Sequence, residues 1–156
     1  MFSIEGTGTR YSYIRGGKYD IQQIENNIAK YATIPDINIA FNVTVQNYNL
    51  LNLKELYDLL HSWANKYDNI SAEKAFTTIC NQPDYLSPLN VPNELRDLAL
   101  NDLDSIDDFR VLCKSLRKRT FDVNKWHTFI DFTKDLDMLR NDNILDHCPE
   151  FGEYFE

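Results

Sequence analysis

One stretch, INIAFNVTV at residues 37–45, decides how this chain folds. Its apolar side chains occupy every second position, the period of a β-strand with two unlike faces, and they are Ile37, Ile39, Phe41, Val43 and Val45. The opposite face carries a row of polar side chains, Asn42, Thr44 and Gln46. This row is unexpected, because strands of parallel sheets are usually buried on both faces. It either lines a barrel interior and faces a cofactor or substrate, or it marks a half-exposed strand whose partner half is missing.

Further strands and helices flank this stretch. Residues 2–5 are short, apolar and compatible with a strand, and residues 72–79 favour a third one. Between the strands, apolar stripes at helical spacing predict helices from about residue 20 to 32 and from about 53 to 63. This alternation predicts an α/β fold with a parallel sheet of about three strands and crossover helices. Three strands cannot close a barrel, so we expect a partial, barrel-like (β/α) sheet.

Glycine and capping residues set the expected boundaries of these elements. The segment GTGTRYSYIRGG at residues 6–17 is rich in glycine, and we predict a loop there. Asn52, with Glu55 three residues later, resembles a capping box at the start of the second helix. Ser105 is predicted to cap a later helix.

From residue 81 onward the chain shows a proline-interrupted loop and then helical patterns alone. Prolines exclude regular structure from residues 81 to 92. Three helices are then predicted, at residues 94–103, 105–119 and 123–139. The segment 146–156 is acidic, with aromatic residues between the charges. We therefore divide the chain into a partial α/β segment, residues 1–80, and a helical carboxyl-terminal region, residues 81–156, that packs on it as a cap.

Composition excludes several classes of protein. The 156 residues carry a net charge of −8, whereas a dedicated nucleic-acid binder usually presents a basic face. The sequence shows no basic and apolar leader and no apolar run long enough for a membrane span, so we expect a cytoplasmic protein without a nucleic-acid or membrane partner. The three cysteines, Cys80, Cys113 and Cys148, are far apart. We therefore expect neither a disulfide framework nor a cysteine-rich metal site within the chain.

Several short segments share their order and spacing with a known family. They are SIEG at 3–6, YIRGG at 13–17, VTV at 43–45, LKEL at 53–56, LDMLR at 136–140 and CPEF at 148–151. Together they resemble a signature of radical S-adenosylmethionine (radical SAM) enzymes, in particular a twitch-type branch that occurs in phage and environmental sequences. The resemblance spans nearly the whole chain and is densest over residues 2–60.

The resemblance implies the carboxyl-terminal portion of a radical SAM protein, with late strands of the barrel and a helical cap. The CxxxCxxC loop that holds the family's [4Fe–4S] cluster has no counterpart in this sequence, and neither has its GGEP segment. A cluster is therefore expected only in a longer parent protein, and this chain alone is not expected to perform radical chemistry. Its implied contribution is to position S-adenosylmethionine (SAM) and substrate, with no catalytic residue and no metal ligand of its own.

Five residues are candidates for binding the cofactor. By resemblance, Ser3 contacts the ribose or methionine moiety of SAM. Arg15 either engages the SAM carboxylate, which a guanidinium can bind through two hydrogen bonds, or organises the loop beside it. Glu5 stands where the commoner family pattern has Asp, near the carboxyl end of the first strand, where ligands of α/β domains bind. Asn42 and Thr44 belong to the polar row. The plainer alternatives are a strand-end hydroxyl at Ser3, an ordinary ion pair at Arg15 and a half-exposed strand at Asn42 and Thr44.

Two functions remain open at this point. In the first, the chain is part of a radical SAM enzyme, and its partner is the missing amino-terminal half. In the second, it is a non-catalytic interaction module derived from that fold. Such a module would bind a partner, or a second copy of itself, through the exposed edge of the strand at residues 2–5 or through the acidic segment 146–156. Whether the chain is itself an enzyme stays open.

Overall fold

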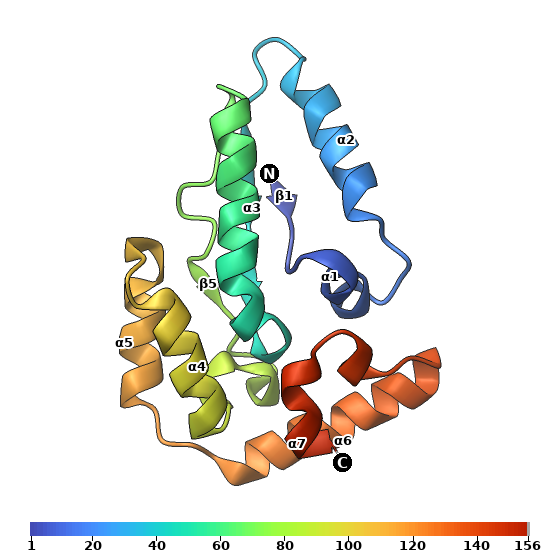
Figure 1. Cartoon of the computed structure of the whole chain (residues 1–156), viewed down its shortest axis with the longest axis vertical. Coiled ribbons are helices and arrows are strands. Elements are labelled where there is room, and N and C mark those ends of the chain that lie inside the picture. Colours follow the sequence, from blue (N-terminus) through green and yellow to red (C-terminus); the bar gives the residue numbers. More distant parts are fainter. Residues whose placement is uncertain (156) are drawn as a thin grey trace.

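The computed structural model describes residues 1–155 and has an α/β fold built on short parallel strands (Figure 1). The strands are β1 (Phe2–Ser3), β2 (Ile39–Asn42), β3 (Thr44–Val45), β4 (Ile70–Ser71) and β5 (Thr78–Ile79). They pair in the orders β1-β2-β4 and β3-β5, and every pair is parallel. Only Val43 separates β2 from β3, and its N–H donates to the Ala75 carbonyl at 2.8 Å, so the two small sheets continue one another. The predicted α/β fold with about three parallel strands is confirmed.

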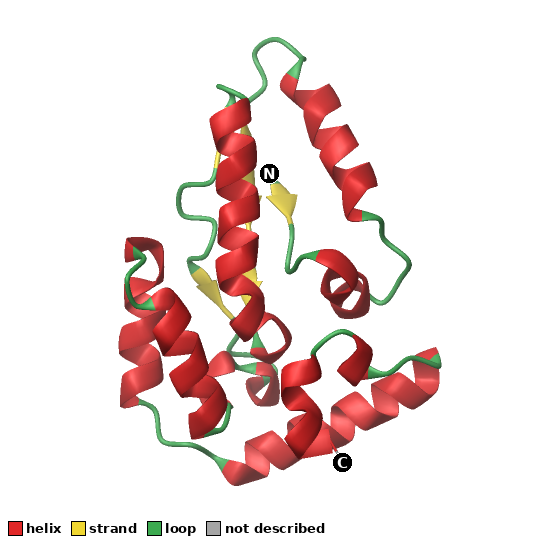
Figure 2. Cartoon of the chain, viewed as in Figure 1, coloured by secondary structure: helices red, strands yellow, loops and turns green. Residues whose placement is uncertain are grey.

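Helices make up most of the remaining structure (Figure 2). They are α1 (Gly8–Arg15), α2 (Ile21–Ala32), α3 (Leu53–Lys66), α4 (Asn93–Leu103), α5 (Arg110–Lys118), α6 (Val123–Arg140) and α7 (Gly152–Phe155). Short 3-10 turns connect several of them, and the one that matters most for the site is η1 (Asn47–Asn52). The helices predicted near residues 20–32, 53–63, 94–103 and 123–139 are confirmed as α2, α3, α4 and α6.

The loop predicted over residues 6–17 is wrong, because most of it forms α1. This helix ends at Gly16, which has a left-handed backbone with φ of 70° and donates its N–H to the carbonyls of Ser12 and Tyr13. Tyr11 and Tyr13 are both buried, although they lie two positions apart and so point to different sides of the helix. The helix is therefore enclosed by tertiary contacts from two directions and shows no single apolar stripe in its sequence.

The third strand and one helix start also differ from the predictions. Instead of a continuous strand over residues 72–79, β4 ends before this range, β5 occupies its last part, and a turn at 72–77 separates them. Within this turn Lys74 adopts a positive φ of 59°, which no strand permits. Ser105 caps no helix: the capping position of the next 3-10 turn is Ile106, and α5 begins at Arg110.

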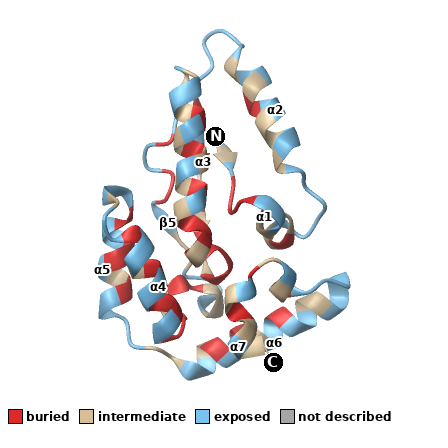
Figure 3. Cartoon of the chain, viewed as in Figure 1, coloured by how far each residue is buried: buried red, intermediate tan, exposed pale blue. Residues whose placement is uncertain are grey.

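Helices α2 and α3 cover the same face of the sheet. Phe2 and Phe41 lie opposite each other in the register of β1 and β2. The ring of Tyr31 in α2 lies 5.7 Å from that of Phe2, and the ring of Trp63 in α3 lies 5.7 Å from that of Phe41. Buried residues concentrate along α3, whereas α2 is mostly exposed or half-buried (Figure 3). The apolar residues of the central strand therefore form the core with α3.

The carboxyl-terminal region packs against α1 and η1. The ring of Tyr48 in η1 lies 5.0 Å from that of Phe129 in α6, and the Tyr48 hydroxyl shares a 2.8 Å hydrogen bond with the Thr133 hydroxyl. The guanidinium of Arg10 binds both carboxylate oxygens of Glu150, at 2.6 and 3.0 Å. These contacts join residues far apart in the chain and hold α6 and the last turns beside α1 (Figure 1).

The aromatic residues of the segment 146–156 do not form a free acidic tail over its described part, which ends at residue 155. Phe151 is buried, and its ring lies 5.9 Å from that of Trp126 and 5.8 Å from that of Phe129. Glu150 is engaged by Arg10, as described above. The segment is therefore part of the core. Separately, none of the helices within residues 1–155 is both long and apolar enough to cross a membrane.

Candidate functional site

The second face of the sheet is lined by polar and small side chains. Neighbouring residues of parallel strands point to the same face, and the register places Ser3 beside Asn42, Ala40 beside Ser71 and Thr44 beside Thr78. These six residues are exposed or half-buried, and we call the surface that they form the open face. The apolar residues that alternate with them, such as Phe41 and Val43, are buried on the helix-covered face.

The last turn of α1 brings a guanidinium to the carboxyl end of β1. Arg15 donates from Nη2 to the carbonyl of Ser3 at 2.9 Å, and its Nε lies 2.8 Å from Oε2 of Glu5. Glu5 is only 7% exposed, whereas the Arg15 side chain is 38% exposed. Burial raises the pKa of the Glu5 carboxyl above its usual range, and the positive charge of Arg15 opposes this shift in part. The ion pair therefore joins the buried carboxylate of Glu5 to the partly exposed guanidinium of Arg15.

This carboxylate is held mainly by its ion pair with Arg15. Oε2 of Glu5 is buried and lies 2.8 Å from Nε of Arg15, and it accepts no further hydrogen bond from any group among residues 1–155. A carboxylate can accept several hydrogen bonds at once, so a hydroxyl or ammonium group of a ligand could join this pair.

Two asparagines of η1 hold the strand ends in place. Asn49 donates from Nδ2 to the carbonyls of Glu5 and Thr44, at 2.8 and 2.9 Å, and its Oδ1 accepts from the Gln46 N–H at 2.8 Å. Asn49 is a capping residue, since Gln46 and Asn49 form the capping box of η1. Asn49 thereby ties the segment that follows β1 to the first residue of β3.

Asn52 acts similarly between α1 and α3. Its Nδ2 donates to the Thr7 hydroxyl and to the Glu55 carboxylate, both at 2.8 Å, and its Oδ1 accepts from the Thr7 N–H at 2.9 Å. The capping box predicted for Asn52 and Glu55 is wrong: their side chains bond to each other, but Asn52 makes no side-chain cap to the α3 backbone. The sequence signal for both supports was the asparagine-rich segment 47–52.

The structure brings the five predicted site residues to one end of the sheet. Ser3, Glu5 and Arg15 are in direct contact, and Asn42 lies beside Ser3 in the sheet. Oδ1 of Asn42 accepts from the Thr78 hydroxyl at 3.1 Å, and the Thr44 carbonyl is held by Asn49. The plainer reading of Arg15, an ordinary ion pair, describes a contact that is present. That contact is made to Oε2 of Glu5, the buried oxygen of the carboxylate.

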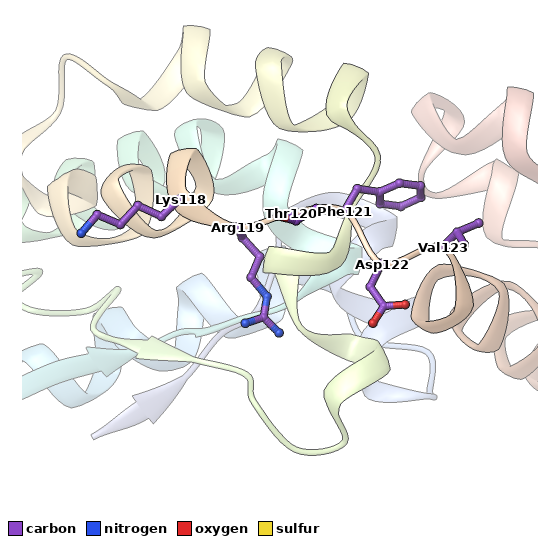
Figure 4. Close-up of a pocket in the computed structure, with 6 residues that line it drawn as sticks. All are labelled: Lys118, Arg119, Thr120, Phe121, Asp122 and Val123. Carbon is purple, nitrogen blue, oxygen red and sulfur yellow. The ribbon is translucent and has the colours of Figure 1, made fainter.

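A hollow elsewhere on the surface gathers no comparable set of groups. About 520 Å³ in volume, it is lined by the consecutive residues Lys118 to Val123 in the segment between α5 and α6 (Figure 4). The carbonyl of Arg119 is engaged by Nη1 of Arg96 at 2.6 Å. Because a single extended segment forms the walls, no groups from different elements converge there, and we do not consider it a functional site.

Neither a cluster of metal-binding side chains nor a similar known protein helps to identify the site. Residues 1–155 contain no group of three or more His, Cys, Asp or Glu side chains placed to hold a metal ion. No family model, no curated protein and no solved structure matches this chain. The resemblance to radical SAM enzymes is therefore a hypothesis based on the sequence segments alone.

Proposed function

We propose that this chain is the carboxyl-terminal part of a radical SAM enzyme, in which the open face forms one wall of the chamber for SAM and substrate. In this proposal the sheet is a partial (β/α) barrel, and a second polypeptide portion completes the barrel and carries the [4Fe–4S] cluster. The chain alone would then position cofactor and substrate without catalysing a reaction.

The observation that carries the proposal is the difference between the two faces of the sheet. In a (β/α) barrel, helices cover one face of a parallel sheet and the other face encloses the interior. Here α2 and α3 lie on one face, and the side chains of the open face are polar or small. Such side chains suit a chamber that holds a polar ligand better than they suit a packed apolar core.

The residues at the carboxyl end of β1 fit SAM in chemistry. The carboxylate of Glu5, which is paired with Arg15, would also accept from a ribose hydroxyl or from the ammonium group of the methionine moiety. Arg15 has donors beyond those used by Ser3 and Glu5, and they would bind the carboxylate of the ligand. When bound, SAM supplies the adenosyl and methionyl groups of the reaction, while these residues bind and orient it.

SAM binding by the full chain tests the ligand part of the proposal. We expect SAM to shift the amide NMR signals of Ser3, Glu5 and Arg15. Glu5→Gln is expected to weaken binding about tenfold, because it removes the charged acceptor. The matched control is Glu73→Gln, an exposed carboxylate in the turn after β4, which should bind as the wild type does. Equal affinities of the two variants would contradict the assignment of Glu5.

The mass of the native protein in its source, together with the coding sequence upstream of Met1, tests the enzyme part. We expect a larger product, or a tightly bound second chain, that contains a CxxxCxxC triad. A native product of 18.3 kDa with no such partner and no upstream triad would refute the proposal, whatever the chain binds.

The alternative, an interaction module that uses the edge of β1, has less support. Ser3 presents its carbonyl on the outer edge of the strand, since the next residue, Ile4, donates its N–H to Asn42 of β2 at 3.2 Å. Arg15 occupies this carbonyl, and a charged side chain over an edge strand discourages pairing with another chain. A monomer at all concentrations in sedimentation would argue further against self-association through this edge.

A further inference from the structure

A second group of charged residues lies where the ends of α1 and α6 meet. A hollow of about 450 Å³ is lined there by Gly16, Gly17, Lys18, Arg140, Asn141 and Asp142. It adjoins another hollow of about 420 Å³, with which it shares Gly17, Lys18 and Asp142. Arg140 reaches α1 by donating from Nη1 to the Tyr13 carbonyl at 2.8 Å. Tyr13 and Arg15 are two positions apart and so lie on nearly opposite sides of the helix, which separates this groove from the site of Glu5.

Two cations of the groove have no carboxylate partner. Neither Lys18 nor Arg140 forms an ion pair with any carboxylate of residues 1–155. This is notable in a chain with 24 acidic and 16 basic side chains. Lys18 is exposed, and Arg140 uses only one of its donors on Tyr13. Both side chains therefore keep donors that an anion can bind.

The acidic groups that line the groove are already engaged. Oδ1 of Asp142 accepts from Nε2 of His147 and from the Asn143 N–H, both at 2.9 Å. The hydrogen bond from His147 holds the pKa of this carboxyl below its usual range. Asp20, which lines the second hollow, caps α2 by accepting from the Gln22 N–H at 2.9 Å. Both carboxylates keep their negative charge, and the positive charge of Arg140 also lowers the pKa of Asp142, so an anion in the groove competes with them for Lys18 and Arg140.

Gly16 allows the guanidinium to lie against the helix end. A Cβ atom at this position would lie 2.6 Å from Nη2 of Arg140, which is closer than real contacts permit. The left-handed φ of 70° also favours glycine here. Arg140 can therefore occupy its position at the rim of the groove because residue 16 is glycine and has no Cβ atom.

The second hollow adds aromatic walls. Tyr19 is 49% exposed, and its ring packs edge-on against Tyr11 with centroids 5.6 Å apart. His147 lines the same hollow, and its ring is tilted against that of Tyr13, with centroids 5.0 Å apart. The hollow therefore combines an exposed aromatic ring, Tyr19, with the ammonium group of Lys18 in one lining.

We propose that this groove binds a ligand that carries a phosphate group on an aromatic or heteroaromatic ring. The phosphate would lie between the Lys18 ammonium and the Arg140 guanidinium, which combine a point charge with a planar pair of donors. The ring would pack against Tyr19 and His147 in the adjoining hollow. This site is separate from the proposed SAM site and stands whether or not SAM binds.

Phosphate titrations of the full chain, followed by amide NMR signals at pH 7.5 and low salt, test this proposal. The two probes are inorganic phosphate and phenyl phosphate. We expect both to shift the signals of Gly17, Lys18 and Asn141, and we expect phenyl phosphate to bind at least threefold more tightly and to shift Tyr19 as well. Equal affinity of the two probes would refute the ring-binding part.

Charge-removing variants locate the binding. Lys18→Gln is expected to weaken phenyl phosphate binding about tenfold, while Lys30→Gln, which removes an exposed lysine on α2, should leave it unchanged. Gly16→Ala serves as a second variant that displaces Arg140 without removing its charge, and it should also weaken binding. Thermal unfolding of each variant verifies that it is folded. If Lys18→Gln and Lys30→Gln bind alike, the proposal fails.

Discussion

The two faces of the small sheet obey different rules, although they are built from alternate residues of the same strands. The covered face buries Val43 and Val45 under α3, and these side chains stabilise the fold. The open face presents Ser3, Asn42 and Thr44, which contribute little to burial and can therefore be selected for binding. The comparison teaches that in this chain stability and candidate function are separated by a single step along a strand.

The largest expected effect comes from the covered face. Leu60→Ala, in the fully buried stripe of α3, should destabilise the protein by about 2–5 kcal/mol because it leaves a cavity in the core. Ser3→Ala, on the open face of β1, is the control and should change stability by no more than about 0.5 kcal/mol, because the Ser3 side chain is exposed. Urea unfolding measures both, and a large loss for Ser3→Ala would show that the open face is covered in solution.

A reciprocal pair of substitutions compares the two faces at neighbouring positions. Val43→Thr buries a hydroxyl on the covered face and should cost about 1–3 kcal/mol. Thr44→Val makes the opposite exchange, a methyl group for a hydroxyl, at a half-buried position of the open face. It should alter the free energy of unfolding by less than about 0.5 kcal/mol. Equal shifts of the unfolding midpoints of the two variants would contradict the difference between the two faces.

The pH dependence of Glu5 gives a smaller effect with a defined sign. Burial raises the pKa of this carboxyl in the folded state above its ordinary value of 4.5, so the folded state binds its proton more tightly than the unfolded state does. Its contribution to stability is therefore fully present below about pH 4.5 and is lost as the pH rises through the folded pKa. Glu5→Gln should be more stable than the wild type at pH 7, and this gain should shrink toward pH 4.

Unfolding curves at several pH values measure this difference. Glu73→Gln, at an exposed position, should show no such gain. A gain for Glu5→Gln that does not depend on pH would mean that burial of the charge is not its cause.

Thiol reactivity sharpens the comparison without perturbing the fold. Cys80, at the end of β5, is half-buried, whereas Cys113 and Cys148 are buried in the core. Burial raises the pKa of Cys148 to about 12, so this thiol stays protonated and unreactive near neutral pH. We expect one thiol, Cys80, to react with iodoacetamide in the native protein, and all three to react after unfolding. Mass spectrometry of digested protein identifies the site, and early labelling of Cys148 would contradict its burial.

Periodic patterns in the sequence predicted the helices and strands that bury a single face. The alternation over residues 37–45 and the stripes of α2 and α3 are local features, and the structure confirms them. Helix α1 was missed because Tyr11 and Tyr13 are buried on different sides of it, so no stripe marks it. The gap between β4 and β5 was missed because the chain turns at Lys74, which has a positive φ. Glycine or asparagine would have indicated such a conformation in the sequence, whereas lysine does not.

Ser3, Glu5 and Arg15 were named from a family resemblance, and Asn42 and Thr44 from the polar row of the central strand. The structure places all five at one end of the sheet. The asparagine-rich segment 47–52 could not show which groups Asn49 and Asn52 bind, because those groups lie 44 and 45 positions away. Hydrogen bonds over such separations leave no periodic trace in a sequence.

By itself the sequence determined that the central strand has one apolar and one polar face, since side-chain direction in a strand follows from backbone geometry alone. Only the tertiary structure decided that α2 and α3 lie on the same side, which leaves the polar face open. It also decided that Arg15 reaches Glu5 and that Arg10 binds Glu150, 140 positions away. Such contacts depend on how the elements pack, and packing is a property of the whole chain rather than of any segment.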